Sequence, residues 1–137
     1  MTTEIILITH DKIGMAMLST CQEIFGDHPL PLTTHAVEVH SGDCPDIIAT
    51  KLEPITAAAE PETKFLVLTD IFGATPCNTA SKIFAKLNAT LVSGLNLAML
   101  LRVFSHPSLS FEELTDKAVQ GGREGIFALS ECECCHD

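Results

Sequence analysis

Short apolar runs alternate with amphipathic segments along the chain. The first run, Glu4–Thr9, is rich in β-branched residues and shows no polar alternation, which is typical of a strand buried on both faces. From Ile13 to Phe25 apolar residues recur at three- and four-residue spacing, which predicts a helix that ends at Gly26. The alternation continues, and further strands are predicted at residues 35–39, 64–69 and 90–94.

The segments between these strands carry helix start and stop signals. Asp43 is the expected N-cap of a helix running towards residue 59, which Pro54 must end or kink. Thr75–Pro76 places an N-cap residue before a proline at the first helical position, so another helix is expected to run from there to residue 88.

The last part of the chain predicts two helices and completes the fold class. A short helix is expected over residues 97–104, and Ser110 with Glu113 forms a capping box for a helix ending near Gly121–Gly122. Strands that alternate with helices imply right-handed crossovers, so we expect an α/β fold: a parallel four-stranded sheet with helices on both faces. Functional residues of such folds lie beyond the carboxyl ends of the strands, which selects residues 9–11, 69–73 and 94–96.

Composition and charge narrow the function classes. The 137 residues are 46% hydrophobic and contain no linker-like stretch, so one domain is expected. The net charge of −10 disfavours nucleic acid and anionic lipid as partners and favours basic proteins. No apolar run approaches the ~18 residues of a membrane span, and the first residues lack the basic region of a secretory signal. The six cysteines are therefore expected to be reduced, and the protein cytoplasmic.

His10 is the candidate for chemistry. It follows the first predicted strand and precedes the first predicted helix, where backbone N–H groups suit a phosphoryl group. A neutral imidazole nitrogen can attack phosphorus when the other nitrogen has a hydrogen-bond acceptor, and Asp70, at the end of the third strand, is the candidate acceptor. A lone loop histidine is more often structural, but His10, Asp70 and the helix start at Thr75–Pro76 coincide at one sheet edge, which favours a site.

Several segments together resemble the IIA component of the mannose-family sugar phosphotransferase system (PTS). The resemblance runs in order from about residue 4 to residue 129, so residues 1–129 are interpreted as one IIA domain. The segments that carry it are ILITH at 6–10, LTDIFGATPCNTAS at 68–81, VSGLNLAML at 92–100, SFEEL at 110–114 and GREGI at 122–126.

The resemblance implies a phosphocarrier, a phosphotransferase component that acts through a histidine. His10 would take a phosphoryl group from the phosphocarrier HPr and pass it to a histidine of a IIB component, while Asp70 orients the imidazole. The hydroxyl of Thr75 would lie near the phosphate, and Phe72 would form part of the docking surface. The resemblance adds two binding positions, Gly73 and Asn96. No cofactor and no metal ion is implied.

The resemblance also implies an assembly. Residues 125–129 match a C-terminal strand that pairs across a homodimer with exchanged ends. Through IIB the chain would associate peripherally with the membrane components IIC and IID, which are expected to select the sugar. No IIB domain follows residue 129, so a stand-alone IIA component is expected, and residues 130–137 are expected to be a short, disordered Cys-rich tail.

Some residues depart from the family pattern or lie outside it. Many relatives have glycine after the histidine, where this chain has Asp11–Lys12. A carboxylate so near a phosphohistidine would destabilise it or raise its transfer potential, unless Lys12 offsets the charge. Arg123 is expected to pair with Glu124, and the tail cysteines to bind metal only adventitiously. The remaining histidines before the tail are interpreted as loop and surface residues: His28, His35, His40 and His106.

Three alternatives are weighed against a transport role. A regulatory phosphoprotein would report PTS flux without sugar transport, and neighbouring IIB, IIC and IID components would argue against it. The phosphoryl donor of dihydroxyacetone kinase shares the fold and the histidine, but the segment Asp70–Asn78 is of the mannose type. A flavodoxin-like nucleotide binder is expected to have a glycine-rich or phosphate-binding loop after the first strand, which this chain lacks. No ATP site is implied either, because the sequence contains no GxxxxGK[ST] stretch.

Overall fold

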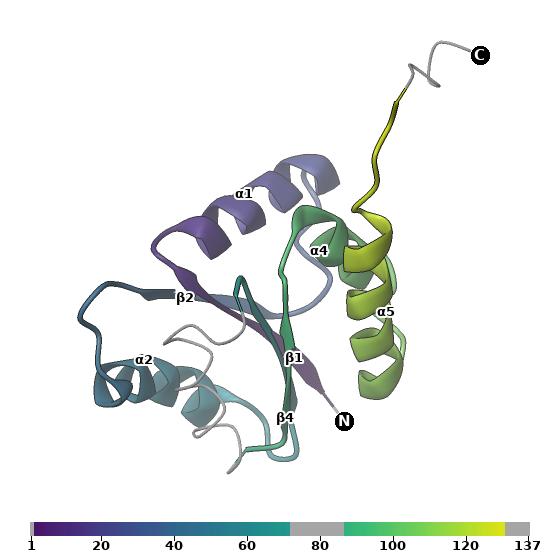
Figure 1. Ribbon diagram of the computed structural model, residues 1–137. Coiled ribbons are helices and arrows are strands. Elements are labelled where there is room, and N and C mark those ends of the chain that lie inside the picture. Colours follow the sequence, from purple (N-terminus) through teal and green to yellow (C-terminus); the bar gives the residue numbers. More distant parts are fainter. Residues whose placement is uncertain (1, 72–86, 131–137) are drawn as a thin grey trace.

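Parallel strands form a single sheet in the computed structural model, which describes residues 2–71 and 87–130 (Figure 1). The strands follow the order β2-β1-β3-β4, and each pairs in parallel with its neighbours. The predicted α/β class and parallel four-stranded sheet are confirmed. The strand bounds also match the predictions closely: β1 Thr3–His10, β2 Thr34–Val39, β3 Lys64–Thr69 and β4 Ala89–Ser93.

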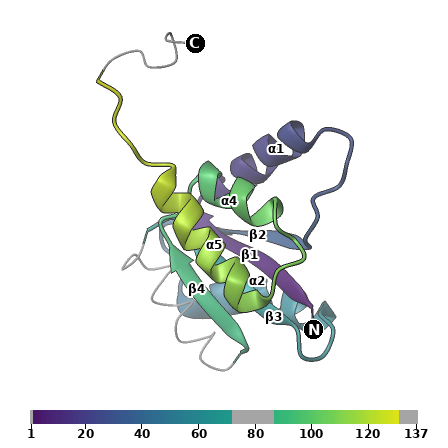
Figure 2. The ribbon, with the colours of Figure 1, turned by 90° about the vertical axis from the view of Figure 1, so that its right-hand side faces the viewer.

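Helices cover both faces of the sheet, as predicted. Figures 1 and 2 show α1, α4 and α5 on one face and α2 on the other. Their bounds are α1 Ile13–Phe25, α2 Pro45–Ala58, α4 Leu97–Phe104 and α5 Phe111–Glu124. The helix predicted from Thr75 to residue 88 falls almost entirely outside the described residues.

The two central strands are apolar on both faces because each face is covered. Ile5 and Leu7 of β1 join the cluster under α1, α4 and α5, whereas Ile6 and Ile8 join the cluster under α2. All four side chains are fully buried. In an antiparallel sheet with one solvent-exposed face, apolar and polar residues would instead alternate along each strand. The unbroken apolar run is therefore explained by helices that cover both faces of this sheet.

The start of α2 differs from the prediction. Cys44, not Asp43, is the N-cap, and its side chain makes no capping hydrogen bond. The Asp43 carboxylate instead closes the preceding turn: its Oδ2 accepts from the backbone N–H of His40 at 2.9 Å and lies 3.3 Å from the Lys51 ammonium. Pro54 does not end the helix, which continues through it to Ala58.

The end of α5 also differs, for a packing reason. The capping box of Ser110 and Glu113 is confirmed, but the helix runs past Gly121 and Gly122 to Glu124. A Cβ at Gly121 would lie 2.5 Å from the Cβ of Arg102 on α4. The glycines therefore permit close approach of two helices rather than marking a helix stop.

The strand order creates a crevice at the edge of the sheet where strands β1 and β3 end. The chain leaves β1 towards β2 on one side, returns to β3 on the other side of β1, and then moves on to β4. The connections after β1 and β3 thus run in opposite directions, which opens a crevice at the carboxyl ends of these strands. His10 ends β1, and Asp70 directly follows β3.

Nothing in the described ranges qualifies as a membrane span, because each helix there is too short or too polar to cross a bilayer.

Candidate functional site

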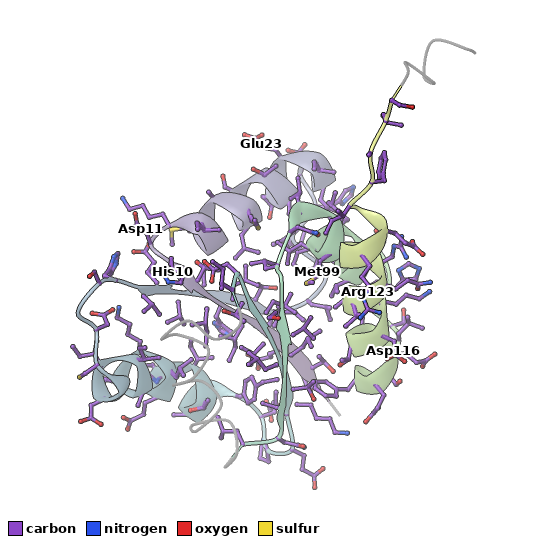
Figure 3. The ribbon with its side chains drawn as sticks, in the orientation of Figure 1. His10, Asp11, Glu23, Met99, Asp116 and Arg123 are labelled. Carbon is purple, nitrogen blue, oxygen red and sulfur yellow. The ribbon has the colours of Figure 1, made fainter. Side chains whose placement is uncertain are left out.

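His10 and Asp70 meet at the carboxyl edge of the sheet. The Nδ1 atom of His10 lies 3.0 Å from Oδ2 of Asp70, and the same oxygen accepts the backbone N–H of His10 at 3.0 Å. Figure 3 shows His10 where β1 ends and the chain turns into α1. The pairing expected from the sequence is therefore present, although 60 residues separate the partners.

The Asp70 carboxylate is held from both sides. Its Oδ1 atom accepts the backbone N–H of Ile71 at 3.0 Å, while Oδ2 is taken by His10. Burial by itself raises the pKa of this carboxyl, but the hydrogen bonds from His10 and Ile71 outweigh it and lower the pKa below its usual value. Asp70 is thus an ionised acceptor with a fixed orientation.

This geometry selects one nucleophilic atom on His10. A carboxylate can only accept, so in the neutral ring Nδ1 carries the proton and donates a hydrogen bond to Asp70. The lone pair is then on Nε2, and the side chain that carries this atom is 46% exposed. A carboxylate in this position can also stabilise a positive charge on the ring if Nε2 forms a bond.

The turn after His10 is fixed by Thr9. Its buried hydroxyl accepts the backbone N–H of Gly14 at 2.9 Å, which ties the end of β1 to the first turn of α1. Lys12, the N-cap of α1, makes no side-chain capping bond. The positive end of the α1 dipole therefore lies just after His10, where it favours an anion.

Asn96 performs a structural task at the same edge. Its Oδ1 atom accepts the N–H of Met99 at 2.8 Å and caps α4, and its Nδ2 atom donates to the Gly122 carbonyl at 3.0 Å. The side chain thus links the loop after β4 to α5. The other three predicted binding residues, Phe72, Gly73 and Thr75, lie outside the described residues.

Sequence reasoning missed His40 as part of this edge. Its Nε2 atom lies 3.1 Å from Oε2 of Glu38, and its Nδ1 atom lies 3.6 Å from Oδ1 of Asp11. The rule that selected the carboxyl ends of the other three strands also applies to β2, which ends at Val39. Applied to all four predicted strands, it would have included His40.

Two ion pairs differ from the sequence expectations. Glu124 pairs with Arg102 of α4 at 2.6 Å, not with Arg123. Asp11 faces His40, and within residues 2–71 and 87–130 Lys12 forms no ion pair with it. His35, interpreted from the sequence as a loop or surface residue, lies instead in strand β2. Its side chain is half-buried, and its Nε2 atom lies 2.8 Å from Oε1 of Glu4.

Comparison with known proteins gives one consistent family. The sequence profile of the family described as "PTS system fructose IIA component" matches residues 4–119. The PTS system mannose-specific EIIAB component of Escherichia coli (strain K12) is 28% identical over 132 residues, with 94% of this chain covered. Only 40% of that relative is covered, so the chain spans about two fifths of its length.

Two further relatives match over nearly their full length. The PTS system sorbose-specific EIIA component of Lacticaseibacillus casei is 28% identical over 134 residues, covering 93% of this chain and 91% of that protein. The solved structure of the mannose/sorbose specific IIA subunit from Enterococcus faecalis is 29% identical, with a TM-score of 0.81. The matched region covers 97% of this chain and 98% of the chain in that structure.

Proposed function

Since the chain belongs to the mannose-type family of PTS IIA components, which implies phosphotransferase activity in general terms, we propose that it is a histidine phosphocarrier. His10 accepts a phosphoryl group from phospho-HPr and passes it to a histidine of a IIB component. The observation that carries this proposal is the hydrogen bond from His10 Nδ1 to the ionised Asp70 carboxylate at 3.0 Å.

The transfer requires mainly positioning and charge stabilisation. The Nε2 lone pair of His10 forms the new bond to phosphorus, and the bond from phosphorus to the donor atom of HPr breaks. The donor atom keeps that electron pair, and the Nδ1 proton stays in its hydrogen bond to Asp70. In the second transfer a IIB nitrogen attacks the same phosphorus, and Nε2 of His10 recovers its lone pair.

Exposed apolar residues support protein partners at this edge. Ile13 and Met15 lie in the first turn of α1, directly after His10, and Ile71 follows Asp70; their side chains are 41%, 55% and 58% exposed. Apolar side chains around a reacting group suit docking of another protein. The net charge of −10 favours basic partners, because opposite charges speed encounter.

The assembly proposed with this function is a homodimer with exchanged C-terminal strands. Strand β4 is an outer strand of the sheet, and a groove of about 460 Å³ beside it is lined by Thr90, Val92 and Val119, among others. Residues 126–129 follow α5 without joining a described strand, and Phe127 is 72% exposed. Pairing this segment with a partner's β4 would cover both features.

The test is phosphorylation in a reconstituted system. The chain is incubated with enzyme I, HPr and phosphoenolpyruvate, and its intact mass is followed beside that of His10→Ala. We expect one acid-labile phosphoryl group on the wild-type chain and none on the variant. Adding a IIB component should then discharge the wild-type chain.

His28→Ala is the matched control, because His28 lies in the loop after α1 and not at the site. This control should take up phosphate like the wild-type chain. An unphosphorylated wild-type chain in the presence of phospho-HPr would contradict the proposed function.

A further inference from the structure

We propose that His40 is a positioning residue for the chemistry of His10: when its ring is protonated, it offsets the charge of Asp11 and keeps that carboxylate from opposing a phosphoryl group on His10. The inference rests on the proposed function only in taking His10 as the phosphoryl acceptor. It concerns Asp11, the acidic residue that directly follows His10 in the sequence.

Parallel pairing of β1 and β2 brings the two residues together. His10 lies opposite Val39 in the strand register, and the backbone N–H of Asp11 donates to the Val39 carbonyl at 2.9 Å. The residue after each partner is therefore at the same edge, which places Asp11 beside His40. Asp11 adopts a φ of 47°, in the left-handed region that Asp and Asn tolerate better than most residues.

The His40 ring lies between two carboxylates. Asp11 faces Nδ1 at 3.6 Å, and Glu38 faces Nε2 at 3.1 Å. A neutral imidazole has only one N–H, so it would turn a lone pair towards one of these anions. Nε2 is within hydrogen-bond distance of Glu38, whereas Nδ1 meets Asp11 only at ion-pair distance. The doubly protonated ring would turn an N–H towards each carboxylate, and this form carries the positive charge that Asp11 lacks elsewhere among the described residues.

Other charged groups around His40 are already engaged. The Asp43 carboxylate accepts the His40 backbone N–H at 2.9 Å and lies 3.3 Å from Lys51. The Lys51 ammonium also donates to the Glu38 carbonyl at 2.7 Å. The hydrogen bond from His40, followed by Lys51, lowers the pKa of Asp43. Lys51 is thus held on the α2 side of the cluster, and His40 is the cation that faces Asp11.

A phosphoryl group on His10 makes this neutralisation matter. His10 and His40 line the same hollow of about 560 Å³, between the end of β1 and the loop after β2. A phosphoryl group carries close to two negative charges at neutral pH. Asp11 and Glu38 without a cation would repel it with two negative charges, whereas a charged His40 between them leaves the cluster with one.

A divalent cation is the competing occupant of the cluster. Asp11, Glu38 and His40 offer ligand atoms that all lie within 4.8 Å of one another. However, the two carboxylates face different nitrogens of the ring, and a metal ion would need both of them on the side of one nitrogen. The arrangement is that of a cation between two anions.

The test compares four variants and two donors at low salt: His40→Gln, Asp11→Asn, the double variant, and His28→Gln as the control histidine. One donor is phospho-HPr. The other is phosphoramidate in its protonated form, from which His10 Nε2 takes the phosphoryl group while ammonia leaves with the electrons of the broken P–N bond. The small donor needs no docking surface. Phosphorylation rates are measured at one fixed pH, first at low salt and again at high salt.

Because the cluster is half exposed, we expect His40→Gln to slow phosphorylation by about three- to five-fold with both donors. Asp11→Asn, whose new residue also tolerates the left-handed backbone, should not slow it, and in that background His40→Gln should have a smaller effect. High salt should shrink the difference between His40→Gln and wild type, because it screens the charges of a half-exposed cluster. His28→Gln should behave like the wild type.

Distinct results would overturn the inference. Equal slowing by His40→Gln with and without Asp11 would make its role structural, and slowing with phospho-HPr alone would place it in docking. Loss of the effect in EDTA would assign the cluster to a metal ion. If phosphoramidate but not phospho-HPr labels His10, the carrier function fails while the variants still decide the role of His40. No label at His10 from either donor would overturn both.

Discussion

At the scale of single residues, the site depends on one carboxylate with several donors. Asp70 receives the backbone N–H of His10, its ring N–H and the N–H of Ile71. Each hydrogen bond favours the charged form and one orientation of the imidazole. Asp70 therefore decides which nitrogen of His10 carries the lone pair.

Asp70→Asn should lower the rate at which His10 is phosphorylated by about 10- to 100-fold. An amide can turn either its oxygen or its N–H₂ towards the ring, so the productive tautomer is no longer enforced, and the positive charge that develops loses its partner. The measurement is the initial rate with phospho-HPr. Asp116→Asn is the control, because Figure 3 shows Asp116 on α5, well away from His10, and its rate should stay at the wild-type level.

The same carboxylate should contribute to stability in a pH-dependent way. Its pKa in the folded protein is lower than the usual 3.8, so folding favours the ionised form. The stabilisation is therefore complete above the usual pKa and is lost as pH falls through the folded-state pKa. We expect wild type to exceed Asp70→Asn by about 1–2 kcal/mol in free energy of unfolding near neutral pH. Urea unfolding at several pH values would contradict this if the gap persisted in strong acid.

At the scale of elements, α4 and α5 pack closely against each other next to the loop that follows β4. Gly121, Gly122 and Gly125 lie where a Cβ would meet α4 side chains at 2.5, 2.9 and 2.5 Å. Asn96 adds a polar tie from the start of α4 to the Gly122 carbonyl. These contacts hold the loop after β4 in place beside the site.

Gly121→Ala should reduce stability, since its new Cβ would lie 2.5 Å from the Cβ of Arg102. Alanine is otherwise the better helix former, so an isolated helix would gain from the change. In the folded protein we expect a loss of about 1–3 kcal/mol in free energy of unfolding, measured with urea. The neighbouring exposed change Gln120→Ala should leave stability within about 0.5 kcal/mol of wild type.

At the scale of the whole molecule, the proposed dimer depends on the segment after α5. Ile126, Phe127 and Leu129 are 76%, 72% and 59% exposed in the single chain. So much exposed apolar surface on a short segment is typical of a part that another surface covers. The groove beside β4 offers such a surface.

Phe127→Asp should shift the chain from dimer to monomer, because a carboxylate cannot be buried unpaired in the exchanged interface. The measurement is light scattering after size-exclusion chromatography over a range of concentrations. Ile24→Asp is the control: Ile24 is similarly exposed but lies on α1. A wild-type chain that runs as a monomer at all concentrations would refute the exchanged dimer.

The sequence alone determined the order of the described elements and the two residues of the candidate site. Unbroken apolar runs predicted β1 and β3 because both faces of a covered parallel strand are dry, and His10 and Asp70 followed from their position after those runs. The capping box at Ser110 and the helix end at Gly26 could be predicted because both depend only on residues close together in the sequence. Family membership then agreed with the motifs.

Only the tertiary structure decided what depends on residues distant in the chain. Gly121 resembles a helix stop until α4 is seen packed against it, and Asp43 resembles an N-cap until its carboxylate is found closing the turn at His40. The pairing of His40 with Asp11 follows from strand register, which no local pattern encodes. Caps and burial patterns depend on residues that are neighbours in the sequence, so they can be predicted from it. Contacts across the sheet and between helices join residues far apart in the sequence and form only when the chain folds.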